Sequence, residues 1–176
     1  MTVTEALEKL KSYEQTSFAL KHAMGLLYYD GVTAAPKGAA AVRGDTTGEL
    51  SRIDYQLTTA PDTVEMLETL MAARTELDEI TRRKVEEYWR DYDRTRRIPE
   101  EEFVAYQRLS IKADDVWQTA KETNDFALFE PYLQEMFDTL KRFALYWEPD
   151  KAPYETLLDN YERGLTTAAC DTFFAA

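Results

Sequence analysis

The stretch FEPYLQEMFDTLKRFALYW, residues 129–147, carries the most regular apolar pattern in the chain. Its large apolar side chains recur at alternating steps of four and three residues, which places them on one face of an α-helix. Aromatic side chains at helical spacing are usually packed in a core, so we interpret this stripe as core rather than as a ligand site. Its members are Phe129, Leu133, Met136, Leu140, Phe143 and Trp147.

Apolar residues at helical spacing also fill most of the chain before this stretch. Over residues 3–28 they recur at steps of three and four, which predicts one long helix with Thr2 or Thr4 at its start. The glycines and proline of residues 28–38 are expected to end this helix. Helical spacing then resumes weakly, with three apolar side chains on one side: Leu50, Ile53 and Leu57.

Proline and acidic residues mark the starts of later helices. Pro61 suits the first turn of a helix, and the apolar stripe after it belongs to one helix or to two. Residues 94–102 interrupt the pattern, and the glutamates at the end of this segment favour a new helix over residues 103–120. Asn124 and Asp125 are expected to stop that helix and to cap the next one.

No pair of strands, internal repeat or low-complexity segment stands out in the sequence. We therefore predict an all-α fold, a multi-helix lobe of long antiparallel helices, with about six to eight helices. Residues 1–176 are expected to form a single helical lobe, in which Thr166 or Thr167 caps the last helix.

The composition argues against several classes of protein. The 176 residues are 44% hydrophobic and 31% charged, which is typical of a globular chain. A formal net charge of -12 disfavours binding to nucleic acid and to anionic membranes. The lone Cys170 rules out an internal disulfide framework, and we find neither a secretory signal nor a membrane-spanning stretch. We expect a cytoplasmic protein.

The sequence contains no recognisable catalytic machinery. His22 is the only histidine, so neither an HExxH zinc motif nor the paired Glu-x-x-His motifs of di-iron bundles can form. The acidic loop of residues 159–171 has Tyr161 and Arg163 where a calcium loop needs oxygen ligands. No glycine-rich phosphate loop occurs either. We therefore expect no catalytic residue and no metal ligand in this chain.

Several segments, in the right order, match motifs of a known family. Residues 90–94 read RDYDR and precede an Ile-Pro-Glu turn, residues 124–126 read NDF, and residues 153–164 read PYETLLDNYERG. On these motifs the chain resembles the zinc carboxypeptidases typified by carboxypeptidase Taq. Further matching residues are Val116, Trp117, Phe129, Pro131 and Leu133.

The front of the chain resembles the same family. The stretch LLYYDGVTAAPKG, residues 26–38, is similar to the family's Leu-Leu-x-Trp-Asp segment and the Met-Pro that follows it. Tyr29 stands where the family has tryptophan, Ala35 replaces methionine, and Arg43 falls on a family arginine. A histidine that usually ends the following helix is missing from SRIDYQL, residues 51–57.

The resemblance implies an all-helical metallopeptidase that removes residues from the C-termini of peptides. In that family zinc, or a similar divalent metal, is held by an HExxH motif and a later glutamate, and the HExxH glutamate activates water. These motifs lie beyond the matched region, so the resemblance assigns no metal ligand or catalytic residue here. The chain would then be the N-terminal part of a larger metallopeptidase, truncated at its C-terminus and inactive alone.

By the same resemblance, this helical lobe would wall or cover the substrate groove. Tyr28, Tyr29 and Asp30 are the candidates for lining that groove; alternatively, Tyr29 packs inside the lobe and Asp30 turns the chain. The expected partners are the C-terminal catalytic part of the same polypeptide and a peptide substrate, with a homodimer as a further hypothesis. The competing hypothesis is a free-standing helical module for protein interactions, without catalysis.

Overall fold

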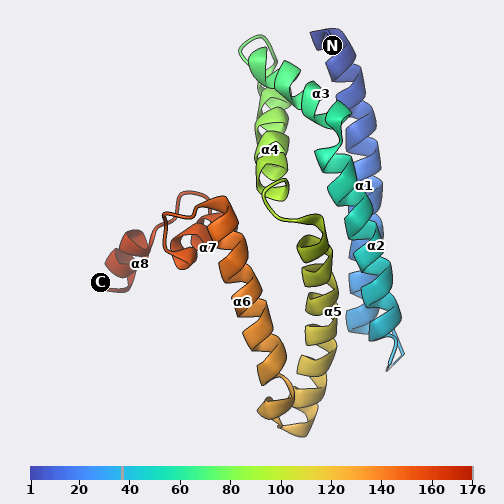
Figure 1. Ribbon diagram of the computed structural model, residues 1–176, viewed down its shortest axis with the longest axis vertical. Helices are drawn as coiled ribbons and strands as arrows, with labels where there is room; N and C mark the ends of the chain where they lie inside the picture. Colours follow the sequence, from blue (N-terminus) through green and yellow to red (C-terminus); the bar gives the residue numbers. More distant parts are fainter. Residues whose placement is uncertain (37, 176) are drawn as a thin grey trace. The chain divides into compact units, whose positions relative to one another are not determined.

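The computed structural model describes residues 1–36 and 38–175, and over these residues it contains helices and no strand (Figure 1). This confirms the predicted all-α class, and the eight α-helices within these residues fall in the predicted range. A short 3-10 helix, η1, covers Phe126–Leu128. The α-helices are α1 (Val3–Thr33), α2 (Ala40–Thr59), α3 (Pro61–Ala72), α4 (Glu79–Thr95), α5 (Glu100–Thr123), α6 (Glu130–Trp147), α7 (Pro153–Tyr161) and α8 (Thr167–Phe174).

The chain divides into two compact units. The first comprises Met1–Asp115 and holds α1 to α4 with the first part of α5. The second begins at Val116 and holds the end of α5, η1, and α6 to α8. The expectation that residues 1–176 form a single lobe stays a prediction.

The first helix, α1, begins with a capping box and runs further than predicted. Glu5 N–H donates a hydrogen bond to Thr2 Oγ1 at 3.2 Å, and Thr2 N–H donates to the Glu5 carboxylate at 2.7 Å. The helix ends at Thr33, later than the glycines and proline led us to expect. A glycine costs a helix only about 1 kcal/mol relative to alanine, so Gly31 does not end it. Gly31 also makes room for Arg43, since a Cβ there would stand 2.8 Å from Arg43 Cζ.

The hydrophobic core of the first unit lies between α1, α3 and α4. Met66 and Leu67 of α3 and Val85 of α4 are fully buried. Full burial of one such side chain stabilises a fold by about 1.5–3 kcal/mol. Tyr13 of α1 packs edge-on against Tyr88 of α4, with ring centroids 5.2 Å apart. These contacts bind three helices into one core.

The second helix, α2, packs through small residues as well as through part of the apolar side predicted for it, since Leu57 lies against the core of the first unit. Ile53, a member of that side, is 50% exposed. Gly48 instead lies against α5, because a Cβ on it would stand 2.5 Å from Arg108 Nε. Small residues let neighbouring helices approach closely, and they leave little hydrophobic signal in the sequence. The buried residues of α2 are Ala40, Gly44, Thr47, Gly48, Ser51 and Thr58.

A turn separates α3 from α4, so the apolar stripe after Pro61 belongs to two helices. Pro61 occupies the first turn of α3, as predicted. Asp78 caps α4 by accepting a backbone N–H bond at 3.1 Å. The chain then leaves α4 at Thr95 and enters α5 at Glu100, which confirms the predicted break within residues 94–102.

In the second unit, α5 ends just before Asn124 as predicted, whereas Asp125 caps the short η1 and not α6, the helix that it was expected to cap. Asn124 follows α5 with a left-handed φ of 54°, a conformation that asparagine tolerates better than most residues. Asp125 then caps η1, its Oδ1 accepting from Ala127 N–H at 3.1 Å. Thr166 caps α8 in a similar way by accepting from Ala169 N–H at 3.2 Å.

The apolar stripe of α6 is less buried than the sequence led us to expect. Phe143 is 3% exposed, and its ring centroid lies 6.3 Å from that of Trp147. Phe129 and Trp147 are only partly buried. Outside the stripe, Phe137 and Leu145 are 54% and 46% exposed. The interpretation of the stripe as core is therefore correct for Phe143 and overstated for Phe129 and Trp147.

Candidate functional site at the end of the first helix

The three residues predicted to line a substrate groove lie near the C-terminal end of α1. Tyr28 and Tyr29 are 61% and 66% exposed, and Asp30 is exposed as well. Tyr29 is therefore not packed inside the unit that contains it. In the last turn of α1, the Asp30 carbonyl accepts from Ala34 N–H and Ala35 N–H at 2.9 Å each. Contact between these side chains and a substrate stays a prediction.

Arg43 brings a positive charge to the same end of α1. It is a partly buried residue of α2, and its guanidinium lies against Gly31, directly after Asp30 in the sequence. Two exposed phenol rings and a carboxylate thus lie on one turn of α1, and a guanidinium from α2 lies next to the glycine that follows them. Such a set can pack against apolar side chains and form hydrogen bonds with a peptide. It contains no nucleophile paired with a base, so it suits binding rather than covalent catalysis.

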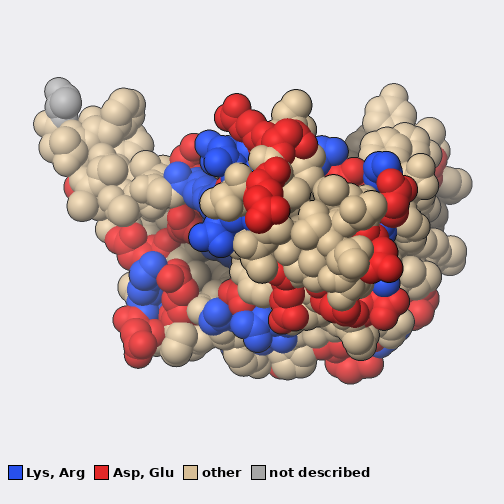
Figure 2. All heavy atoms as spheres, turned by 90° about the horizontal axis from the view of Figure 1, so that it is seen from above, with Lys and Arg blue, Asp and Glu red and all other residues tan. Residues whose placement is uncertain are grey.

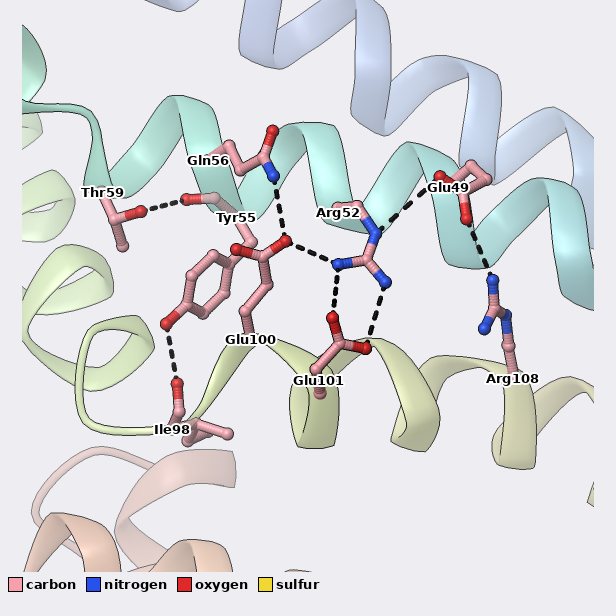
Figure 3. Close-up of polar contacts among 9 residues, drawn as sticks. All are labelled: Glu49, Arg52, Tyr55, Gln56, Thr59, Ile98, Glu100, Glu101 and Arg108. Atoms are coloured by element: carbon pink, nitrogen blue, oxygen red, sulfur yellow. Dashed lines mark hydrogen bonds and ion pairs between the residues drawn. The ribbon is translucent and has the colours of Figure 1, made fainter.

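An ion-pair network fixes the start of α5 against α2 (Figure 3). Arg52 on α2 donates from Nη1 to the carboxylates of Glu100 at 2.7 Å and Glu101 at 2.9 Å, and from Nη2 to Glu101 at 3.2 Å. Gln56 Nε2 donates to Glu100 at 2.9 Å. The paired geometry raises the pKa of Arg52 through its hydrogen bonds to Glu101 and Glu100, and it lowers the pKa of Glu101.

Two further contacts extend this network along α2. The Tyr55 hydroxyl donates to the Ile98 carbonyl at 2.8 Å, which holds the turn before α5 (Figure 3). Arg108 Nη2 donates to Glu49 at 3.0 Å one turn further along. Each charged group drawn in Figure 3 lies beside a group of opposite charge, so we assign this network a structural role rather than a place in a site.

A carboxylate of α2 with a different environment is Asp54. Its Oδ1 is buried and accepts no hydrogen bond from the residues that the structure describes. Burial raises the pKa of Asp54, while the positive charge of Lys21 lowers it and the negative charge of Asp91 raises it further. Desolvation also raises the pKa of Asp91, a residue of α4 that is exposed as a whole. Burial and then the nearby Glu14 raise the pKa of Tyr88 to about 12.

An open pocket of about 230 Å³ lies within the second unit, at the corner between α5 and α6. Its floor includes Ala120, which is 6% exposed. Lys121 lies above the Trp117 ring, with Nζ 5.1 Å from the ring centroid. The other lining residues are Asn124, Phe126 and Phe129. The sequence singled out several of these residues as caps or core, but nothing in their spacing predicted a pocket.

The chain's own residues do not fit a catalytic metal. Among residues 1–36 and 38–175, no group of three or more His, Cys, Asp or Glu side chains is placed to hold a metal ion. Acidic side chains instead lie beside basic ones over the face shown in Figure 2. In the described part of the chain, no helix is long and apolar enough to cross a membrane.

Comparison with known proteins gives a consistent result along the chain. The profile of the family described as carboxypeptidase Taq (M32) metallopeptidase matches residues 9–176. Carboxypeptidase 1 of Bacillus subtilis (strain 168) is 33% identical over 174 residues, which is 95% of this chain and 35% of that protein.

Solved structures agree with the sequence matches. The BsuCP crystal structure has a TM-score of 0.90 and 33% identity, covering 98% of this chain and 34% of that one. The Apo-Mg structure of Pyrococcus furiosus carboxypeptidase has a TM-score of 0.73 and 29% identity, covering 99% of this chain and 34% of that one. The chain therefore spans about a third of the length of these relatives.

Proposed function

The chain belongs to the carboxypeptidase Taq (M32) metallopeptidase family, and we propose that it acts as the N-terminal, groove-forming part of a zinc metallocarboxypeptidase. Such an enzyme would remove residues from the C-termini of peptides. The observation that carries this proposal is the family match over residues 9–176, combined with coverage of about a third of the relatives' length. A cytoplasmic location belongs to the same proposal, based on the lone Cys170.

In this proposal the catalytic metal is held by residues outside the chain. The chain has one histidine, and its described residues hold no cluster of three potential metal ligands. A bound zinc ion would polarise the peptide carbonyl and activate water. The residues of this chain would contribute binding and positioning, and the chain alone would be inactive.

The end of α1 is the part of the chain that we propose to contact the peptide. Tyr28 and Tyr29 offer apolar ring surface with a hydroxyl at the edge, which suits a groove that accepts varied side chains. Arg43 and Asp30 offer charges for the peptide backbone or termini. The ion-pair network of Arg52 helps to hold α2, which carries Arg43, in place.

The proposal is tested by assaying the complete product of the gene that encodes this chain. We expect hydrolysis of a blocked dipeptide to depend on a divalent metal and to stop when a chelator removes it. Residues 1–176 alone should release no C-terminal residue and should bind no zinc stoichiometrically by calorimetry. Activity or a tight zinc site in residues 1–176 alone would contradict the proposal.

The groove assignment is tested in that complete product by Tyr29→Ala. Loss of a binding surface should raise KM several-fold and leave kcat nearly unchanged. Tyr154→Ala is the matched control, because Tyr154 is 67% exposed and Tyr29 is 66% exposed. Equal effects of the two substitutions on KM would remove Tyr29 from the groove.

A free-standing interaction module is the second candidate function. It is favoured by large apolar side chains at the surface, among them Phe173 and Phe174, which are 76% and 82% exposed. If the gene product ends at residue 176, shows no peptidase activity and forms one defined species in solution, this second function replaces the first.

A further inference from the structure

We propose that the pocket between α5 and α6 binds an aromatic side chain that carries a neighbouring carboxylate, such as the C-terminal Phe or Tyr of a peptide. The inference concerns binding only. It stands on the geometry of the second unit and does not depend on the proposed peptidase reaction.

The walls of the pocket are aromatic and accessible. Trp117 is 43% exposed and Phe126 is 59% exposed, although both are large apolar side chains that a fold usually buries. Phe126 and Phe129 pack edge to face, with centroids 6.4 Å apart and planes at 75°. A ring that enters can therefore meet both faces and edges of aromatic neighbours, which is the preferred geometry of aromatic pairs.

The size of the pocket matches one side chain. Its volume of about 230 Å³ leaves room for one aromatic ring, since an apolar cavity of about 150 Å³ is enough to bind benzene. A larger ligand would have to leave part of its surface in solvent.

The charge of the pocket favours a carboxylate on the ligand. Lys121 forms no ion pair with the residues that the structure describes, and its ammonium lies over the Trp117 ring instead. Lys151, by contrast, pairs with Glu148 at 2.6 Å. Lys121 is thus available to an anionic group that approaches the ring, and it would repel a cationic ligand.

The turn that carries these groups is fixed before any ligand binds. Asp125 N–H donates to the Ala120 carbonyl at 2.9 Å, and Asp125 Oδ1 accepts from Ala127 N–H. The Asp125 carboxylate is therefore occupied in capping η1. Asn124, in its left-handed conformation, adds an amide that can donate to a carboxylate. A prearranged site needs little ordering when it binds.

The experiment uses 19F NMR of protein labelled with 5-fluorotryptophan, so that the signal of Trp117 reports on the pocket directly. The protein is the complete gene product, and Trp117→Phe assigns the signal. The probes are N-acetyl-phenylalanine, its uncharged amide, and N-acetyl-alanine. We expect a saturable shift with the aromatic acid, affinity about fivefold weaker with the amide, and no shift with N-acetyl-alanine.

Two substitutions separate the charge from the ring. Lys121→Gln should remove the preference for the acid over the amide, and Phe126→Ala should weaken both aromatic probes. Lys141→Gln is the matched control, because Lys141 is an exposed lysine of α6 that lies 3.7 Å from Asp138. It should change neither affinity.

Three results would overturn the proposal. One is a Trp117 signal that does not move with any probe, which includes the case of a pocket filled by another segment of the gene product. Another is equal affinity for acid and amide, which would show an apolar pocket without a role for Lys121. The third is an equal effect of Lys121→Gln and Lys141→Gln. None of these results bears on metal-dependent peptidase activity, so the two proposals fail separately.

Discussion

The apolar stripes of α3 and α6 have similar spacing in the sequence but different burial in the structure. In α3, Met66, Leu67 and Leu70 are all fully buried. In α6, Phe143 is 3% exposed, whereas Trp147 is only partly buried. The reason lies in the neighbours: α3 contacts α1, α2 and α4, while in its own unit α6 contacts η1 and α7. Spacing identifies the inward face of a helix, and the number of surrounding helices decides how deeply that face is buried.

The largest effect expected from this comparison is that of Leu67→Ala in α3. Removing a fully buried side chain leaves a cavity among tightly packed helices, so the free energy of unfolding should fall by about 2–5 kcal/mol. Urea denaturation followed by circular dichroism measures the change. Leu145→Ala on the outer side of α6 is the control, since Leu145 is 46% exposed and should change stability by no more than about 0.5 kcal/mol. Similar losses for the two variants would break the comparison.

A smaller effect is expected for Trp147→Ala at the end of the α6 stripe. Replacing a fully buried tryptophan with alanine lowers the free energy of unfolding by about 3–5 kcal/mol, and for the partly buried Trp147 we expect about half of that. Phe143→Ala, at a position that is 3% exposed, should lie in the full range. The comparison is sharpened if Phe143→Ala is the more destabilising of the two in urea, and it is weakened if the order is reversed.

The partial burial of the Asp54 carboxylate in the first unit should lower the stability of the protein at neutral pH. Because burial raises the pKa of Asp54, its contribution to stability is most favourable below the unfolded pKa of about 3.9 and is lost as pH rises through the folded pKa. The residues around this carboxylate include Tyr13, Lys21 and Asp91. Asp54→Asn should therefore increase the free energy of unfolding at pH 7 by up to about 1 kcal/mol, which is measured as a higher urea midpoint. The gain should shrink towards pH 4, and a loss of stability at pH 7 would contradict the assignment.

The smallest effect is expected for the ion pair between Arg52 of α2 and the exposed Glu101 of α5. Glu101 has a lowered pKa, so its contribution is present above the unfolded pKa of about 4.3 and is lost as pH falls, opposite to Asp54. Glu101→Gln should lower the urea midpoint slightly at pH 7 in low salt and not at all in 1 M salt. Arg83→Gln, at a 3.8 Å pair with Glu86, is the control and should show no change. A salt-independent loss would mean that packing, not charge, holds this contact.

The candidate site was only partly predictable. The motif around Tyr29 pointed to the end of α1, and the structure places Tyr28, Tyr29 and Asp30 at its surface. The contact of Arg43 with Gly31 could not be predicted, because it joins two helices and depends on how they pack against each other. The pocket beside Trp117 was missed for a similar reason: its members served as caps or core in the sequence pattern, and their convergence depends on the turn at Asn124.

The sequence by itself determined the all-α class, the break before α5, and threonine caps at the starts of α1 and α8. These features depend on residues close together in the chain, so local propensity and hydrogen bonding are enough to specify them.

Tertiary structure alone decided that α2 packs through Gly48 and its other small residues, that Ile53 is exposed, and that one carboxylate oxygen of Asp54 is buried without a hydrogen bond from the described residues. A small residue carries almost no hydrophobic signal, and the pKa of a carboxylate depends on groups brought to it from other helices. Depth of burial, close approach and the electrostatic environment of a side chain are properties of the assembled helices rather than of any one segment.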